Sequence, residues 1–410
     1  MDEPKNSMSY ESGVQMPQQA ADSMHETPNN TYKYICGHIM TQMTATAGIK
    51  KHGQAAVDAL QQEFCQLDSK DVFDPVDALT LTAGQKREAF RAVNLIKEKR
   101  SGKLKGRTCA DCRSQRAHYT KEETTLSTVS TDVLMLSLMI DAKEGRDVAT
   151  ADVKGAYLHA DMEDFVILKL VGEAVDIMCQ VNPKYKKFVV VKHGKKILDL
   201  QLLKALYGCV QSVLLWYELF TGTLVDMGFK LNPYDPCVAN SQVKGKQCTV
   251  AWYIDDKISH VDNTVVTDVI EKIEAKYGKM TVIREKHHLF LGRDITFNDD
   301  ATVTLLMKEY LKEAIANLGM DASRVAATPV KRDLFAIDDK SDHLEKKKGK
   351  LLHSIVAKLL YISKQARNDL QLAVAFLCTL VSCSRARLGQ VSQAFTVLEW
   401  YFGSCSHSWS

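Results

Sequence analysis

The sequence predicts an α+β fold, in which a region of helices and antiparallel strands is followed by a helical region. Two observations support this prediction. Short strand patterns bounded by turns occur between residues 146 and 307, and apolar residues at helical spacing dominate from about residue 308. The length of 410 residues and the 45% hydrophobic content indicate a globular protein of two or three subdomains that share a core.

Helices are predicted wherever apolar residues recur every three or four positions. A flexible lead-in is expected over residues 1–50. The helix ending at Tyr277 is expected to stop at Gly278, and Tyr207-Gly208 should interrupt another. The spacing predicts helices at 52–66, 84–99, 129–140, 202–227, 266–277, 308–319, 351–365, 369–381 and 390–402.

Strands are predicted from alternating apolar residues and from turn residues. The clearest pattern is 247–262, in which apolar residues alternate up to Ile254, the run stops at Asp255-Asp256, and a second strand follows at 258–261. A hairpin is expected over 186–200, with His193-Gly194 at its turn. Further strands are predicted at 146–153, 280–284, 289–297 and 302–307.

Composition excludes several classes of protein. The formal net charge of +3 is too small to identify a partner, so local basic clusters must do so. The longest apolar stretch, 372–381, is about half the length of a membrane-spanning helix, and no signal-peptide pattern opens the chain. Eleven cysteines without repeated spacing predict free thiols in a reducing compartment, and the single CxxC at Cys109 and Cys112 lacks a second pair for zinc.

Three aspartates lie where predicted strands end or turn. Asp152 ends one strand, and Asp255-Asp256 form the turn between two others. Hard cations such as Mg²⁺ prefer oxygen ligands, and adjacent carboxylates at one turn need a compensating positive charge. Because neighbouring residues on a strand face opposite sides, we expect Asp255 to be the main ligand of the pair. The alternative is an ordinary turn, as expected for Asp299-Asp300.

Several ordered segments resemble one protein family. YIDD at 253–256 resembles the Tyr-x-Asp-Asp box of reverse transcriptases, and ADVKGAYLHADM at 151–162 is similar to the segment that carries their first catalytic aspartate. Over about residues 50–400, the chain resembles copia-type retrotransposon polymerases, and its motifs follow one another in the order found in that family. The further segments are 89–116, LLKALYGCVQSVLLWY (202–217), NPYDPCVAN (232–240), HLFLGRDI (288–295), ATPVKRDL (327–334) and SIVAKLLYISKQARNDLQLAVAF (354–376).

The resemblance implies a right-hand polymerase, with fingers and palm over 51–300 and a thumb- or connection-like region over 301–410. It implies RNA-directed DNA synthesis, in which a primer 3′-hydroxyl attacks the α-phosphate of a deoxynucleotide. Asp152, Asp255 and Asp256 would be catalytic and would bind two Mg²⁺ ions, with Mn²⁺ as a substitute. The partners implied are deoxynucleotides, a primed RNA or DNA template and other polyprotein domains, with no membrane.

Other residues gain roles from the same resemblance. Tyr157 would lie beneath the sugar and exclude a 2′-hydroxyl, although it could instead be a core tyrosine. Lys105 and Arg107 would hold the triphosphate, or belong to a solvated basic loop. Gln211 falls in the nucleotide-pocket segment. The primer and template would contact Tyr253, Phe290, Leu291 and Gly292, the last three forming a primer-grip turn or simply an apolar strand with a glycine.

Departures from the family pattern leave an alternative open. Ser212, Val213 and Leu214 replace its usual Ala-Pro-Arg, Lys stands at 154, and Cys112 stands where glycine is usual. The chain is also expected to stop before any RNase H domain. The alternative is therefore a catalytically silent, truncated element remnant that at most binds nucleic acid; a two-metal nuclease has little support. The expected location is cytoplasmic, in a particle, or nuclear.

Overall fold

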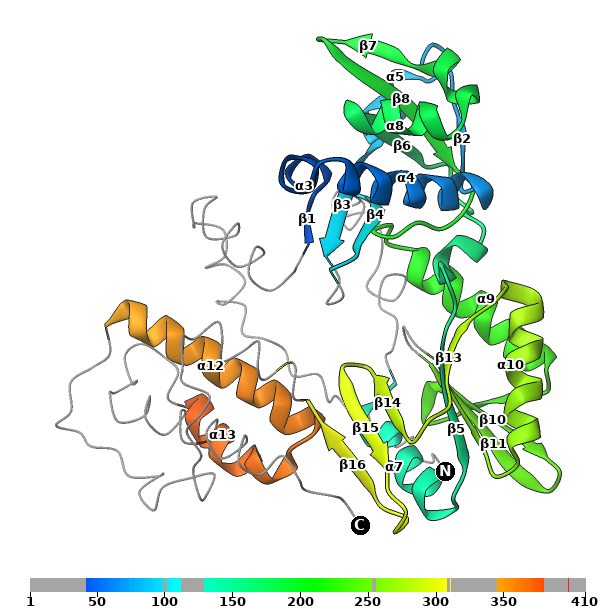
Figure 1. Cartoon of the computed structure of the whole chain (residues 1–410), viewed down its shortest axis with the longest axis vertical. Coiled ribbons are helices and arrows are strands. Elements are labelled where there is room, and N and C mark those ends of the chain that lie inside the picture. The colour runs from blue at the N-terminus through cyan, green and yellow to red at the C-terminus, as the bar shows by residue number, and fades with distance from the viewer. Residues whose placement is uncertain are drawn as a thin grey trace, which may run out of the picture. The chain divides into compact units, whose positions relative to one another are not determined.

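The structure is a computed structural model, and it describes residues 42–98, 102–111, 129–252, 256–307, 310, 345–379 and 397. The chain divides into a smaller unit, Met1–Cys65 with Val93–Thr108, and a larger unit, Gln66–Ala92 with Cys109–Ser410. Helices and antiparallel strands occur together, so the predicted α+β class is confirmed (Figure 1). The predicted helices at 308–319 and 390–402 lie outside the described residues, apart from positions 310 and 397.

In its described part, the smaller unit contains helix α3, most of helix α4, strand β1 and parts of two further strands. Helix α3 (Ala45–His52) is followed by α4 (Gln54–Ser69), which confirms the helix expected at 52–66. Strand β1 (Gln42–Thr44) pairs with the end of β3 (Phe90–Glu98). Strand β4 (Leu104–Ala110) passes so close to α4 that a Cβ at Gly106 would lie 2.5 Å from a helix carbonyl oxygen.

The helix predicted at 84–99 is wrong for most of its length. A capping box, in which Thr82 and Gln85 exchange side-chain and backbone hydrogen bonds, begins a short helix α5 (Ala83–Glu88). The chain then turns at Ala89 and continues as β3. The apolar residues of Phe90–Glu98 fit both helical and strand periods, and pairing with neighbouring strands decides between them.

In the larger unit, β6 (Ile167–Val171) lies between the start of β3, parallel to it, and β8 (Lys195–Leu202), antiparallel. Strands β2 (Phe73–Pro75) and β7 (Val190–Lys192) also pair with β8, and α8 (Glu173–Val181) follows β6. The predicted hairpin turn is confirmed, because His193 and Gly194 have φ values of 50° and 72°, as a two-residue type I′ turn requires. A 3₁₀ helix, η3 (Pro183–Phe188), replaces the first part of the predicted strand.

A second sheet has the strand order β13-β5-β12-β11-β10-β9 and is antiparallel throughout. Helices α9 (Ser212–Asp226) and α10 (Asn263–Tyr277) pack on one face of this sheet. Phe220 of α9 forms a core there with the strand residues Val250 and Ile258. The strands are β13 (Thr281–Ile283), β5 (Asp147–Asp152), β12 (Asp256–His260), β11 (Lys246–Trp252), β10 (Asp235–Val243) and β9 (Lys230–Asn232).

The other face carries helix α7 (Thr131–Lys143) and a small sheet of β14 (His287–Phe290), β15 (Arg293–Phe297) and β16 (Val303–Leu306). The single strand predicted at 289–297 is therefore wrong. Leu291 and Gly292 have φ values of 50° and 75° and form a two-residue turn between β14 and β15.

The helical C-terminal region is confirmed in its described part by α12 (Lys346–Gln365) and α13 (Gln371–Thr379). Helix α9 begins only at Ser212, so the helix predicted from 202 is too long. Gly208 has a φ of 94°, and a Cβ there would lie 2.2 Å from the Ala110 carbonyl oxygen, so this close approach requires glycine. None of the described helices combines the length and apolar character needed to cross a bilayer.

Candidate metal and nucleotide site

Two of the three predicted carboxylates lie at one end of the β5–β12 strand pair. Asp152 is the last residue of β5 and is exposed, whereas Asp256 is the first residue of β12 and is buried. Asp256 lies directly opposite Ala151, so these two side chains share a face of the sheet and Asp152 lies on the other. The third carboxylate, Asp255, lies outside the described residues, as do Tyr253 and Ile254.

The side chain of Asp256 lies on the face of the sheet that helices α9 and α10 cover. Trp252 and Ile258, its neighbours on the strand pair, belong to the core beneath α9 and α10. Burial raises the pKa of Tyr277 on α10, and the negative charge of Asp256 acts in the same direction. Asp256 is therefore close to a packed aromatic core, while Asp152 opens to solvent.

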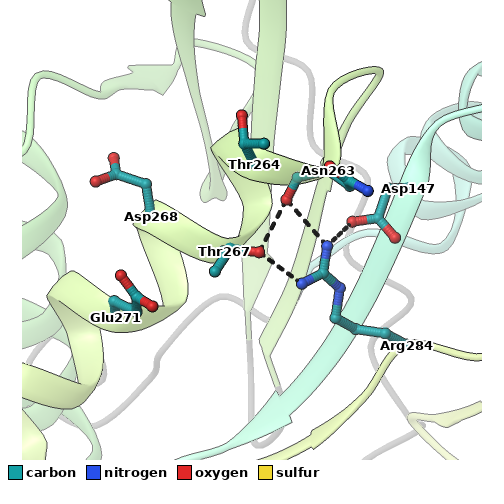
Figure 2. A pocket seen from close by; sticks show the side chains of 7 residues that line it. All are labelled: Asp147, Asn263, Thr264, Thr267, Asp268, Glu271 and Arg284. Carbon is teal, nitrogen blue, oxygen red and sulfur yellow. Dashed lines mark hydrogen bonds and ion pairs between the residues drawn. The ribbon is translucent and has the colours of Figure 1, made fainter.

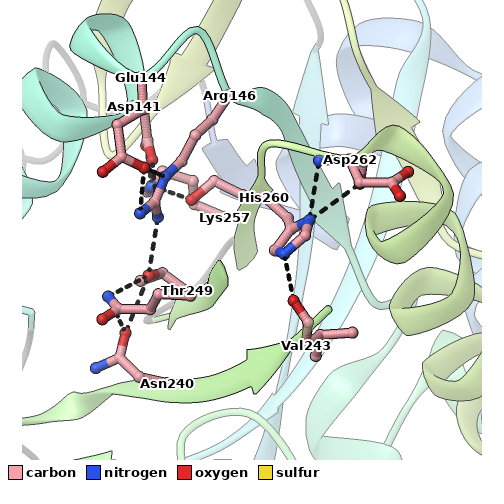
Figure 3. A network of polar contacts seen from close by, with 11 residues as sticks. Asp141, Glu144, Arg146, Asn240, Val243, Thr249, Lys257, His260 and Asp262 are labelled. Atoms are coloured by element: carbon pink, nitrogen blue, oxygen red, sulfur yellow. Dashed lines mark hydrogen bonds and ion pairs between the residues drawn. The ribbon is translucent and has the colours of Figure 1, made fainter. Parts of the chain in front are cut away.

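The opposite face of the same strands holds a buried ionic network (Figure 3). Lys257, which is fully buried on β12, donates to the Asp141 carboxylate on α7, itself 1% exposed. Arg146 Nη1 lies 3.8 Å from Asp141 Oδ1 and donates to Thr249 Oγ1 at 3.3 Å. The network joins α7 to β11 and β12 immediately beside the predicted catalytic turn.

Asp299-Asp300 forms the ordinary turn that was expected from the sequence. Asp300 accepts hydrogen bonds from the backbone N–H and the hydroxyl of Thr302, at 3.1 and 2.6 Å, within its own turn. Asp299 is exposed and pairs with Lys286. These hydrogen bonds lower the pKa of Asp300. An Asp-Asp sequence at a hairpin tip can therefore be purely structural in this chain.

Tyr157 lies five residues after Asp152, on the 3₁₀ helix η2 (Ala156–His159). Its ring packs edge-on against Tyr207, with centroids 4.9 Å apart, and it borders the core beneath α9. It is half-buried, so part of the ring remains accessible. The structure thus allows both the sugar-contacting role and partial membership of the core.

The turn that carries Tyr157 is fixed by a residue that sequence reasoning missed. His159 Nε2 lies 2.8 Å from Lys70 Nζ, and its ring packs 5.3 Å from Tyr277. Burial and the Lys70 charge lower the pKa of His159, so the neutral imidazole accepts from the ammonium group. No local pattern links Lys70 to His159, since 89 positions separate them.

Gln211 is the residue before α9 and is half-buried. The next residue, Ser212, departs from the family pattern, and its hydroxyl donates to the Leu206 carbonyl at 2.7 Å. This bond holds the start of α9 against the irregular 203–211 segment. The departure at Ser212 is therefore accommodated by a local hydrogen bond.

Lys105 and Arg107 belong to the smaller unit, on β4, where Lys105 is exposed and Arg107 half-buried. The Thr108 N–H on the same strand donates to Glu63 Oε1 at 3.0 Å. Burial raises the pKa of Glu63, while that hydrogen bond and the charges of Lys105 and Arg107 oppose the increase. Both cations thus project from a strand tied to α4.

The predicted primer-grip residues form the β14–β15 hairpin. Phe290 is fully buried, whereas Leu291 is half-buried and Gly292 exposed at the turn. His288, also on β14, lies 3.1 Å from the Thr150 hydroxyl through Nδ1, which joins this hairpin to β5. These residues lie at a turn, whereas a primer-grip role and contact with a primer stay predictions.

A cavity of about 450 Å³ lies at the start of α10 (Figure 2). It is lined by Asp147, the first residue of β5, whereas Asp152 is the last residue of that strand. Arg284 crosses it, pairing with Asp147 and donating to Thr267 Oγ1 at 2.8 Å. None of the predicted site residues lines it. Over the described residues, no group of three His, Cys, Asp or Glu side chains is placed to hold a metal ion.

Comparison with known proteins identifies the family. Residues 80–332 match the model of "Reverse transcriptase (RNA-dependent DNA polymerase)". The chain is 23% identical over 235 residues to the "Putative transposon Ty5-1 protein YCL074W" of Saccharomyces cerevisiae (strain ATCC 204508 / S288c), covering 57% of this chain and 70% of the relative.

A solved chain, "Structure of the foamy viral protease-reverse transcriptase dRH in complex with ds DNA", matches with 11% identity and a TM-score of 0.45. That match covers 86% of this chain and 48% of the solved one, so the chain spans about half the length of that protein. The family model matches more than half of the chain, in the region where the ordered motifs lie. The chain belongs to the reverse transcriptase (RNA-dependent DNA polymerase) family, in its copia-type retrotransposon branch.

Proposed function

We propose that this chain is an RNA-directed DNA polymerase that extends a primer 3′-hydroxyl with deoxynucleotides. The observation that supports it most is the register of β5 and β12, in which Asp256 lies opposite Ala151. Asp152 is the last residue of β5 and is exposed, so its carboxylate is accessible to a metal ion. Asp152 and Asp255 would be the main carboxylates, and Asp256 a supporting one.

The donor set fits Mg²⁺. Asp152 is exposed and, among the described residues, pairs with no cation. Carboxylate oxygens are the ligands that Mg²⁺ prefers, and Mn²⁺ accepts the same set. Two such ions would lower the pKa of the primer hydroxyl and neutralise the departing pyrophosphate. The chain itself contributes position and charge, with no covalent enzyme intermediate.

The partners proposed are a primed RNA or DNA template and deoxynucleotides, with fingers and palm over 51–300 and a thumb-like region over 301–410. Particle association in the cytoplasm, or a nuclear location, is part of the same proposal. Other element polyprotein domains could join it there.

Primer extension on a primed RNA template with Mg²⁺ tests the proposal. The wild-type chain is expected to extend the primer, and Asp255→Ala to abolish extension. The matched control is Asp299→Ala, which removes an exposed aspartate from a hairpin tip that is only a turn and should leave extension unchanged. A folded wild-type chain that binds the template without extending it would instead support the silent-remnant alternative.

Tyr157→Ala is expected to increase ribonucleotide incorporation relative to deoxynucleotide incorporation, on the order of 10- to 100-fold, because a removed steric contact changes selectivity by that amount. Single-nucleotide incorporation with both substrates measures the ratio. Tyr157→Phe keeps the ring that packs on Tyr207 and should keep the discrimination. An unchanged ratio in the alanine variant would place Tyr157 in the core instead.

Lys105→Gln and Arg107→Gln are each expected to increase the deoxynucleotide KM about 10- to 100-fold, the effect of losing one charged hydrogen bond. Steady-state extension at varied nucleotide concentration measures it. Lys103→Gln, an exposed lysine just before β4, is the control and should change KM little. If template affinity fell while KM stayed constant, these cations would belong to the nucleic-acid channel.

A further inference from the structure

A dense group of lysines lies on η3 and the β7–β8 hairpin in the larger unit; we call residues 183–196 the lysine hairpin. Residues 183–198 contain six lysines and no aspartate or glutamate. The whole chain has a formal charge of only +3, so the remaining residues sum to a net negative charge. All six side chains are exposed: Lys184, Lys186, Lys187, Lys192, Lys195 and Lys196.

Among the described residues, acidic side chains pair with two of these lysines. Lys196 pairs with Asp176 on α8, and Lys184 Nζ lies 3.6 Å from Asp68 Oδ1. Within the described part of the chain, the other four form no ion pair. A surface with this much uncompensated positive charge attracts polyanions at long range.

The pairing of the hairpin adds a second observation. Lys192 and Lys195 lie directly opposite each other across the type I′ turn, and like charges in that position destabilise a strand pair. Lysines on an edge strand can prevent edge-to-edge aggregation, but only Lys192 lies on the edge strand β7. The repulsion is therefore unexplained by the fold and would be relieved by a bound anion.

The base of the lysine hairpin is well fixed. Tyr185 is fully buried, and its hydroxyl donates to Asp68 Oδ1 at 2.6 Å. The other oxygen of the same carboxylate, Oδ2, accepts a hydrogen bond from Asn182 Nδ2 at 3.0 Å. Figure 1 shows β7 and β8 extending as a two-stranded ribbon from the end of their sheet. The charges are thus presented on an ordered surface, which reduces the entropy lost on binding.

We infer that the lysine hairpin is a second nucleic-acid contact, which binds the phosphate backbone of the template–primer without base specificity. The inference takes its ligand class from the proposed function. Exposed lysines at a hairpin tip act as point charges toward phosphates, and such contacts position a nucleic acid without reading its sequence. The surface is separate from the carboxylates, so it would contribute to template affinity and not to the chemical step.

The test is the salt dependence of binding, measured by fluorescence anisotropy with a labelled primed RNA template and with a single strand. The assay contains neither Mg²⁺ nor nucleotide, so it reports on a chain that cannot polymerise. For Lys192→Gln/Lys195→Gln, the slope of log K against log salt should fall by about 0.7 per contact on a single strand and about 0.9 on a duplex. Thermal stability should stay equal or rise, because the cross-strand repulsion is removed.

The matched control is Lys230→Gln/Lys246→Gln, which removes two exposed lysines from the other large sheet. It should leave the slope unchanged. An unchanged slope in the hairpin variant, or an equal fall in both double variants, would overturn the inference. The inference would also be overturned if the hairpin variant bound nucleic acid normally and lost only binding to vesicles that contain phosphatidylserine. Weaker binding by the hairpin variant in a chain without extension activity would support the inference while contradicting the polymerase proposal.

Discussion

Replacing Asp152 with asparagine is expected to lower the rate of primer extension by about three orders of magnitude or more, comparable to the loss of a principal electrostatic contact in other active sites. The side chain is exposed at the end of β5 and contributes no described ion pair to the fold. Its amide is nearly isosteric but cannot supply the negative charge that divalent cations require. Single-turnover extension and urea unfolding of the same preparation separate chemistry from folding.

Asp256→Asn is the informative comparison. Its side chain lies on the helix-covered face, opposite that of Asp152, so we expect a smaller loss of extension together with a measurable change in stability. Equal and complete losses in both variants, with stability unchanged, would contradict the assignment of Asp256 to a supporting role. Full activity of the Asp152 variant would contradict the polymerase proposal itself.

Asp141→Ala is expected to destabilise the chain by about 3–5 kcal/mol, because it leaves Lys257 buried without its partner. Both residues are almost completely inaccessible, and Arg146 would lose the same carboxylate. Urea unfolding monitored by tryptophan fluorescence measures the change. The exposed pair formed by Lys272 and Asp268 provides the control, since Asp268→Ala should cost about 0.5 kcal/mol or less.

The double variant Asp141→Leu/Lys257→Met distinguishes charge from packing. Replacing a buried ion pair with apolar side chains of similar volume is often neutral, so it should recover most of the loss. Incomplete recovery would show that Arg146, whose Nη1 also reaches Thr249, depends on the carboxylate. A loss of less than about 1 kcal/mol in Asp141→Ala would mean that water or a neighbouring group compensates Lys257.

The sequence predicted best where local pattern and turn chemistry agree. Strand β5 ends on Asp152 as expected, and His193-Gly194 forms the expected turn, because alternation and positive-φ residues are local signals. The predicted helix was wrong at Phe90–Glu98, where the apolar spacing fits both a helix and a strand. The predicted single strand was wrong at Leu291-Gly292, where a short turn divides one apolar run.

The candidate site was predictable through motifs and not through contacts. The family resemblance located Asp152 and Tyr157, but the residues that hold their surroundings come from distant parts of the chain. Lys70 contacts His159 across 89 positions, and Lys257 contacts Asp141 across 116. Such pairs form only after the fold brings them together, so no local pattern in the sequence indicates them.

The buried pair of Asp141 and Lys257 has a consequence for how this element can diverge. A change at either position alone would leave an unpaired buried charge between α7 and β12, next to Asp256, so copies with single changes should misfold and be lost. Copies that survive should carry correlated changes at 141 and 257. The two positions are thus expected to change together, although they lie 116 residues apart in the sequence.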